Sequence, residues 1–385
     1  MCICFHRGVK LALALGYSAL VGSASALEAS GFSYTVSKGK VTVTGLVQTA
    51  FEGELVIPST LGGATVTAIG EAAFDQLDGL ESLVLPDRVK TIGARAFAGC
   101  AQLGRVQFGA ELEIVGPEAF SGCVSLASAT LPALVEEVGP GAFMGCVALE
   151  ELMLGEKVET IGASAFEGCV SLLAVVIPDR VEIIGERAFA GNAALAEVTL
   201  GAAVETIGAY AFAFCEGLSE VTVPDAVETI GAHAFEGCGG LTSANLGAGV
   251  EQIGDRAFYA CTNLASVSFS GDTPTLGVEV FALAEQATVY YQDGTLGWSA
   301  EFGGRPSEPL AFRIDCAPAS VTPAAEGFGL TVKGPLNRTF VVEACATLGG
   351  AWVPLETNVL ATGSQAFVDR NSKKFRSRFY RVRGL

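Results

Sequence analysis

Cysteine is the residue type whose number and spacing come closest to suggesting metal or redox chemistry in this chain. Seven of the eleven cysteines follow a 23-residue period that Asn192 interrupts once: Cys100, Cys123, Cys146, Cys169, Cys215, Cys238 and Cys261. No C-x-x-C pair or histidine group accompanies them, so zinc or redox spacing is not met. We favour buried free thiols that each donate a weak S–H hydrogen bond to a backbone carbonyl, a bond that the Asn192 amide would also make.

A second column with the same period is acidic. It comprises Glu113, Glu136, Glu159, Glu182, Glu205, Glu228 and Glu251. Stacked carboxylates repel one another, and a column kept despite this could recruit calcium or a basic partner. Calcium takes several oxygens whereas each level supplies one carboxylate, so we favour a repeated, solvated glutamate that keeps an open sheet soluble and discourages edge pairing. We expect no metal ion and no cofactor.

Residues suited to acid–base catalysis are scarce. The only histidine besides His6 is His233, and the equivalent repeat positions hold Arg187, Tyr210 and Arg256, which indicates a variable, solvated position. Catalysis needs a base or metal ligand beside a nucleophile or acid. Adjacent glutamates could cleave a glycosidic bond, but residues one strand apart on an open face form no cleft. We therefore expect a protein that is not an enzyme, with a glycan-acting enzyme as the least favoured alternative.

The element that positions these columns is a ladder of ten phenylalanines spaced by 23 residues. They are Phe74, Phe97, Phe120, Phe143, Phe166, Phe189, Phe212, Phe235, Phe258 and Phe281, each preceded by a glycine four positions earlier. A period held this strictly predicts a solenoid of stacked units. At the ~4.8 Å spacing of paired strands, ten units make a rod roughly 50 Å long.

One unit, residues 158–180, illustrates the expected packing. Residues 172–178 are predicted to form a strand with Leu172, Val175 and Ile177 buried, and Phe166 fills the core beneath a tight bend. Twelve residues after successive phenylalanines, proline and glycine alternate: Pro86, Gly109, Pro132, Gly155, Pro178, Gly201, Pro224 and Gly247. The alternation indicates that a block of two units was duplicated.

The unit pattern I-G-x-x-A-F-x-x-C-x-x-L-x-x-V-x-L-P-x-x-V-x-x resembles the BspA-type (Treponema-like) leucine-rich repeat family over residues 32–288. Residues 32–70 resemble that family's opening segment, which implies a first β-unit that caps the exposed end of the core. Related repeats bind host extracellular proteins and other cells. The resemblance therefore implies that the array binds an extracellular or surface protein.

The expected organisation has five parts. Residues 1–26 have the basic start, short apolar core and A-x-A site of a secretory signal peptide, with an N-terminal anchor as the alternative. Residues 27–68 form the N-terminal β cap, and 69–288 form ten repeat units of which the last is degenerate. Residues 289–309 are a closing segment and linker, and 310–385 form a small, sandwich-like β-domain. We expect an exported protein, secreted or on the cell surface, without a later membrane span.

The charge of the chain is divided between its two parts. Residues 27–305 hold 35 acidic and 11 basic residues, whereas 306–385 hold 6 acidic and 10 basic residues. An acidic solenoid repels phosphate backbones, which makes nucleic acid an unsuitable partner. Seven basic residues without an acid among them end the chain: Arg370, Lys373, Lys374, Arg376, Arg378, Arg381 and Arg383. They could dock on an anionic envelope polymer or on the solenoid of another copy, or they could be a solvated strand and terminus.

The C-terminal part also carries a resemblance and a cysteine pair. Residues 340–385 resemble the C-terminal β-domains of exported proteins of the verrucomicrobial type, whose role is usually unassigned. Cys316 and Cys345 lie outside the array and are candidates for a disulfide in an exported protein.

The eighth and tenth residues after each phenylalanine are expected to form the exposed strand face of the solenoid. Our candidate binding residues on it are Arg105, Gln107, Glu151, Met153, Val176, Glu197, Thr199, Glu220, Thr222 and Asn245. The remaining positions are mostly small or hydroxylated, including Ser243, Ser266 and Ser268, and Met153, Ala174 and Val176 form a mild apolar patch. Large aromatic anchors are absent. The face is therefore either a plain solvated sheet or a weak, extended binding surface.

Overall fold

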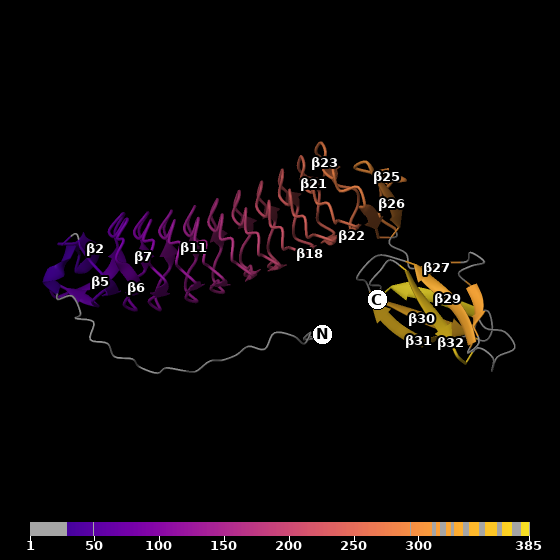
Figure 1. Cartoon of the computed structure of the whole chain (residues 1–385), viewed down its shortest axis with the longest axis horizontal. Coiled ribbons are helices and arrows are strands. Elements are labelled where there is room, and N and C mark those ends of the chain that lie inside the picture. The colour runs from indigo at the N-terminus through magenta and orange to yellow at the C-terminus, as the bar shows by residue number, and fades with distance from the viewer. Residues whose placement is uncertain are drawn as a thin grey trace.

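The computed structural model describes residues 29–48, 50–292, 294–309, 313–315, 321–324, 327–333, 339–345, 351–359, 364–371 and 379–384. The predicted signal peptide therefore lies outside the described residues. Figure 1 shows a long rod of stacked turns followed by a smaller β-unit. Among the described residues, no helix combines the length and hydropathy needed to cross a membrane.

One sheet of 13 strands runs along the rod. It begins after the 3-10 turn η1 (Ala29–Gly31) with the antiparallel pair β1–β2; β4 also pairs with β5 in antiparallel, and the other pairings are parallel. The strands are β1 (Phe32–Ser37), β2 (Lys40–Leu46), β4 (Thr60–Leu61), β5 (Ala64–Ile69), β7 (Thr91–Ile92), β9 (Ile114–Val115), β11 (Glu137–Val138), β13 (Thr160–Ile161), β15 (Ile183–Ile184), β17 (Thr206–Ile207), β19 (Thr229–Ile230), β21 (Gln252–Ile253) and β23 (Thr275–Leu276). From β7 onward, each turn contributes two residues to this sheet.

The strand face is built from the other strand of each turn and is divided into three sheets. They are β3 (Gly53–Val56), β6 (Leu80–Val84) and β8 (Arg105–Gln107); β10 (Ser128–Thr130), β12 (Glu151–Met153), β14 (Ala174–Val176) and β16 (Glu197–Thr199); and β18 (Glu220–Val223), β20 (Ser243–Leu246), β22 (Ser266–Phe269), β24 (Thr288–Tyr291), β26 (Arg305–Pro309) and β25 (Glu301–Phe302). Strand β8 is not paired with β10, and β16 is not paired with β18. The strand face therefore has two seams, while the long sheet has none.

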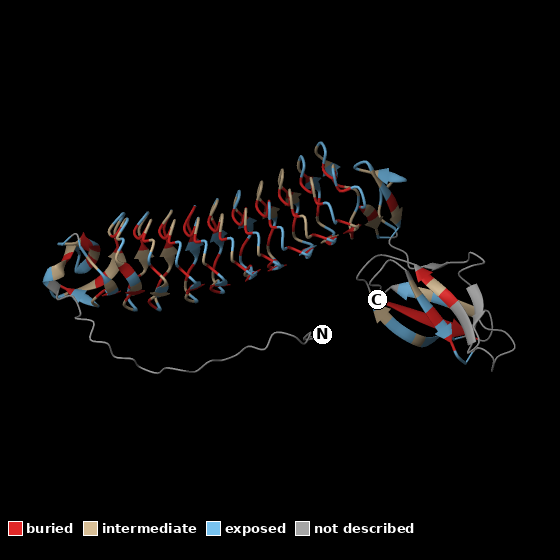
Figure 2. Ribbon diagram, viewed as in Figure 1, coloured by how far each residue is buried: buried red, intermediate tan, exposed pale blue. Residues whose placement is uncertain are grey.

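The phenylalanine ladder forms the axis of the core, as predicted. Nine consecutive ring pairs, from Phe74 to Phe281, stack with centroids 5.1 to 5.6 Å apart and planes 4 to 18° apart. In the unit of residues 158–180, Leu172, Val175 and Ile177 are buried. Figure 2 shows buried residues recurring on the inside of every turn. Each unit thus buries its apolar side chains against copies of themselves.

The two-unit period has a steric explanation. A Cβ atom added to Gly201 would meet the carbonyl oxygen of Pro178 at 2.2 Å, and Gly109, Gly155 and Gly247 stand in the same relation to the preceding proline. The next residue contributes as well, because the Ala202 N–H donates to Asp179 Oδ1 at 3.0 Å. A turn that contains proline is therefore followed by one that contains glycine, since only glycine allows the close backbone approach.

The far end of the solenoid corrects one expectation. Residues 304–309 were expected to be part of a linker, but 305–309 form β26, which pairs with β24 in parallel and with β25 in antiparallel. Trp298 and Phe302 contact Phe269 with centroids 4.9 and 5.5 Å apart. The segment therefore extends the sheet and covers the core, because its alternating residues follow the register of β24.

The C-terminal part has a core of its own. One sheet has the order β27 (Arg313–Asp315), β29 (Gly327–Lys333), β28 (Val321–Ala324), with β32 (Ser364–Asp369) paired to β29; the other has the order β31 (Val353–Val359), β30 (Thr339–Cys345), β33 (Phe379–Gly384). Leu330, Val332, Phe340, Val342 and Phe367 form the core between them. These pairings are antiparallel, as in the predicted sandwich-like fold.

The proposed disulfide is not formed in this part of the chain. Cys345 is a buried free thiol, and Cys316 lies outside the described residues. Cys345 packs as a small apolar residue at the end of β30.

Candidate interaction surfaces of the solenoid

The strand face is exposed over its central units. The candidate residues on β8, β12, β14, β16 and β18 are all exposed, and Asn245 on β20 is half-buried. Parallel register places equivalent residues side by side, as in the pairs Ala174–Glu197 and Val176–Thr199. Their exposure follows the prediction, whereas a role in binding stays a prediction.

The expectation of exposure is wrong at the C-terminal end of this face. Ser243, Ser266 and Ser268 are buried. Ser268 donates a hydrogen bond to Asn245 Oδ1 at 2.7 Å, and the larger Tyr290 follows it in the same register column. Small side chains beside larger ones are covered by them, so the open part of the face ends near β20.

Two open grooves gather six of the ten candidate residues. Met153 and Val176 line a groove of about 520 Å³ whose other residues include Leu154, Ile177 and Arg180. A groove of about 850 Å³ follows the seam between β16 and β18, and it is lined among others by Glu197, Thr199, Glu220 and Thr222. The remaining candidates, Arg105, Gln107, Glu151 and Asn245, line neither of these grooves. The structure thus concentrates the candidate face on the fourth to seventh units.

Exposed Leu173 was missed from the sequence. Its side chain is 55% exposed and precedes β14, where the next turn's Ala196 N–H donates to its carbonyl oxygen at 2.9 Å. The equivalent positions of the neighbouring turns hold Glu150 and Ala196. The only available signal was that a large apolar residue replaces a small or charged one at a position outside the buried alternation.

The glutamate column is partly neutralised at two levels. The Glu136 N–H donates to the Glu113 carbonyl oxygen at 2.8 Å, and the N–H groups of Glu159, Glu205, Glu228 and Glu251 make the same bond to the preceding glutamate of the column. Lys90 forms an ion pair with Glu113, and Arg180 forms one with Glu159 at 3.3 Å. Among the described residues, no group of three or more histidine, cysteine or acidic side chains could hold a metal ion. The expectation that no calcium binds this column stays a prediction.

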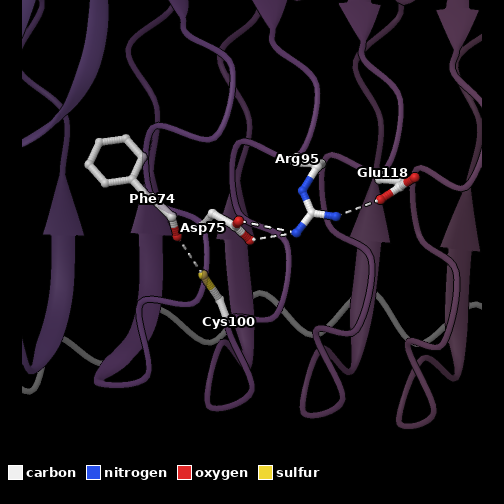
Figure 3. Close-up of polar contacts among 5 residues, drawn as sticks. All are labelled: Phe74, Asp75, Arg95, Cys100 and Glu118. Atoms are coloured by element: carbon white, nitrogen blue, oxygen red, sulfur yellow. Dashed lines mark hydrogen bonds and ion pairs between the residues drawn. The ribbon is translucent and has the colours of Figure 1, made fainter.

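The bend face carries a third column, two residues before each phenylalanine. Figure 3 shows the Arg95 side chain between Asp75 and Glu118, with ion pairs of 3.1 and 3.0 Å. Arg95 adopts a φ of 55°, and every equivalent non-glycine residue has a positive φ. The left-handed backbone turns these side chains outward in a row, where opposite charges pair along the rod.

His233 lies in this bend column and is more enclosed than expected. Its side chain is 18% exposed, its ring stacks on Tyr210 with centroids 4.4 Å apart, and its Nδ1 hydrogen-bonds to Glu236. Arg187 lies over the other side of Tyr210, 5.3 Å from the ring centroid. The expectation of a solvated position is therefore wrong, because aromatic stacking covers the imidazole. His233 is therefore one member of a stack of side chains along the bend column.

Phe214 interrupts the bend pattern. It lies two residues after Phe212, where six other units have glycine, with a φ of 60° and half of its side chain exposed. Its ring covers Gly237, since a Cβ atom there would meet Phe214 Cδ1 at 2.6 Å. A bulky residue in the left-handed region is strained. The sequence signal was a phenylalanine in a glycine column.

The cysteine column contains the predicted buried thiols. Each of the seven donates to the carbonyl oxygen of the phenylalanine 26 residues earlier, at 3.1 to 3.3 Å, as Figure 3 shows for Cys100 and Phe74. Burial raises the pKa of the Cys100 thiol to about 12. The prediction for Asn192 is wrong: its amide is buried, and neither polar atom has a hydrogen-bond partner. The planar amide is larger than a thiol and does not reproduce the thiol's geometry.

The basic residues at the end of the chain are only partly described. Lys373, Lys374, Arg376 and Arg378 lie outside the described residues. Arg381 and Arg383 both pair with Glu343 of the neighbouring strand, at 2.6 and 3.6 Å, and Arg381 lies over Trp352 at 4.5 Å. Arg370 is exposed and follows β32. Part of the basic charge is therefore neutralised within the domain.

Comparison with known proteins identifies the repeat. The family described as "BspA type Leucine rich repeat region (6 copies)" matches residues 67–196 and 182–296. A leucine-rich repeat protein from Bacteroides ovatus is 23% identical over 73% of this chain and 98% of its own, with a TM-score of 0.35. The leucine-rich repeat protein of T. pallidum is 23% identical over 68% of this chain and 90% of its own, with a TM-score of 0.28.

A third solved structure, the pneumococcal vaccine antigen PcpA, is 18% identical over 69% of this chain and 92% of its own, with a TM-score of 0.30. No curated protein matches the chain.

Proposed function

The chain belongs to the BspA-type leucine-rich repeat family, and from this premise we propose that it is an exported recognition protein of a bacterial cell surface. It binds an extracellular or surface protein, or another cell, through its repeat surface and without catalysis. Export rests on the signal peptide predicted at residues 1–26.

The contrast between buried and exposed repeat positions carries this proposal. The ladder phenylalanines from Phe97 to Phe281 are all fully buried. The exposed strand-face position of successive units instead reads Arg105, Ser128, Glu151 and Ala174. A uniform core thus supports a surface that differs from unit to unit. Such a surface suits recognition of an extended partner, because broad interfaces are built from many such positions.

Docking of the C-terminal domain on an anionic envelope polymer is the second candidate. The excess of basic residues after Pro306 favours it. The pairing of Arg381 and Arg383 with one buried carboxylate, Glu343, weakens it, since a polymer would have to compete with that partner. The two functions place the contact on different parts of the chain.

Binding measurements on the mature chain separate these candidates. Immobilised matrix proteins and envelope polysaccharides are tested with the chain from residue 27, with the double variant Glu197→Arg/Glu220→Arg, and with a chain ending at residue 309. The shortened chain keeps a complete solenoid core, because the core residues of the two parts are distinct. We expect the shortened chain to bind a protein ligand and the double variant to lose at least tenfold in affinity.

Two results would overturn the proposal. If binding is lost when residues 310–385 are removed, and the double variant binds with unchanged affinity, the result supports docking by the C-terminal domain. Hydrolysis of a glycan panel that is lost when Glu136 and Glu159 become glutamine supports the enzyme alternative.

A further inference from the structure

The fourth and fifth turns expose neighbouring apolar residues in the middle of the strand face. Met153 and Val176 are each 64% exposed and Leu173 is 55% exposed, and Ala174 lies between them on β14. We name these four residues the central patch. Strand β14 pairs with β12 on one side and with β16 on the other, so the patch lies within a paired sheet. Contiguous exposed apolar residues on an otherwise polar surface are typical of an interaction site.

The central patch continues into a depression that can receive a side chain. Met153 and Val176 form one border of the groove of about 520 Å³, and Leu152, Leu154 and Ile177 contribute its apolar lining. Its charged border consists of Glu156, Asp179 and Arg180. The Arg180 guanidinium is held by Glu159 at 3.3 Å, and Asp179 accepts the Ala202 N–H. Among the described residues, Glu156 and Asp179 of this border form no ion pair.

Unpaired carboxylates border the central patch on both sides. Glu150 and Glu151 precede it by one turn, and Glu197 and Glu220 follow it by one and two turns. Within the described chain none of these four exposed glutamates has an ion pair. At ~4.8 Å per turn, Glu151 and Glu220 are separated by roughly 14 Å along the rod.

A second copy of this chain does not suit the central patch. A twofold contact through the fifth turn would bring Glu151 of one copy toward Glu197 of the other, and like charges in contact are destabilising. A complementary partner presents an apolar group in the middle and positive charges at both ends.

We propose that the central patch binds an extended protein segment in which one apolar residue is flanked on both sides by lysine or arginine. The proposal rests on the proposed recognition function and names the partner's chemistry. In an extended segment that lies along the rod, residues i, i+2 and i+4 face the patch and span about 13 Å. The apolar residue enters the groove, and the two cations meet Glu151 and Glu220.

Peptide selection on the mature full chain tests this chemistry. Random 12-residue peptides displayed on phage are selected on the wild-type chain and depleted on the Val176→Glu variant. We expect the enriched peptides to share the pattern basic–x–apolar–x–basic. The affinity of a representative peptide should fall at least tenfold in Val176→Glu and remain within twofold in Thr130→Glu, an exposed residue at the same strand position two turns earlier. Glu151→Gln should lower the affinity of the chain for the peptide and reduce the dependence of that affinity on salt.

Each contrary outcome overturns the inference. Peptides without flanking basic residues, no enrichment over background, or equal affinity for Val176→Glu would each do so. A dimer in sedimentation that Val176→Glu dissociates would assign the patch to a second copy instead. Thermal unfolding of both variants checks that they fold. If a matrix protein binds wild type and Val176→Glu equally, this inference fails while the proposed function stands; if no ligand binds wild type, the proposed function fails.

Discussion

The Cys215 thiol donates a hydrogen bond to the carbonyl oxygen of Phe189, at 3.2 Å, across the boundary between two turns. The same bond is made by each cysteine of the column, from Cys100 to Cys261. Within this run of units, Asn192 occupies the one level where the bond is missing, and the carbonyl group that a thiol would reach there belongs to Phe166.

Replacement of Asn192 by cysteine should stabilise the protein. The substitution Asn192→Cys removes two buried, unpaired polar groups and supplies the thiol that the other seven levels between Cys100 and Cys261 use. A buried polar group without a partner costs about 1–3 kcal/mol, so we expect a gain of that order in the free energy of unfolding. Urea denaturation measures it. Cys169→Asn serves as the reverse control, and equal or lower stability of Asn192→Cys would contradict this account.

The thiol column should make the protein sensitive to alkali. Burial raises the pKa of Cys100, Cys169 and Cys238 from the ordinary 9.0 to about 12. Between these values the unfolded chain binds fewer protons than the folded one, so stability falls as pH rises from about 9 to about 12 and is unaffected by these thiols below 9. In urea, thiolate absorbance at 240 nm should appear near pH 9. Without urea, it should appear only when the protein unfolds. Native titration near pH 9 would show that the thiols are accessible.

Gly201 should not tolerate a methyl group. The Gly201→Ala side chain would meet the Pro178 carbonyl oxygen at 2.2 Å, and backbone has to move. We expect a loss of about 1–3 kcal/mol, as for overpacking. The matched control is Gly104→Ala, whose Cβ atom would lie 3.7 Å from the nearest atom and should leave stability within about 1 kcal/mol. Thermal unfolding compares the two, and equal losses would argue against the close approach.

Core stacking should outweigh the ion pairs of the bend face. Phe120→Ala removes a fully buried ring that stacks on both neighbours, at a cost of about 3–5 kcal/mol. Arg95→Ala removes two exposed ion pairs, which contribute little to stability and less still in high salt. Urea denaturation at low and high sodium chloride gives both values. A large, salt-sensitive loss in Arg95→Ala would show that the bend column is a structural element.

The regular part of the fold could be predicted because its signal is repeated. Phe166, Leu172 and Cys169 were assigned to the core from their recurrence, and all three are fully buried. The prediction of a linker at 304–309 was wrong. Its glycine and prolines are typical of a break between elements, but Ser307 pairs with Val289, and this pairing depends on the register between two strands. The predicted exposure of Ser266 and Ser268 was wrong for a related reason. Alternation predicts which way a side chain points, but not which other side chains cover it.

The sequence by itself determined the solenoid, its 23-residue turn, the buried phenylalanine and cysteine columns and the family to which the chain belongs. These features follow from local periodicity, since each buried residue meets a copy of itself. Only the tertiary structure decided the seams of the strand face, the enclosure of His233 by Tyr210, and the exposure of Leu173 beside the predicted apolar patch of Met153, Ala174 and Val176. Those features depend on contacts between different residues of neighbouring turns. A repeat pattern records only what the turns have in common.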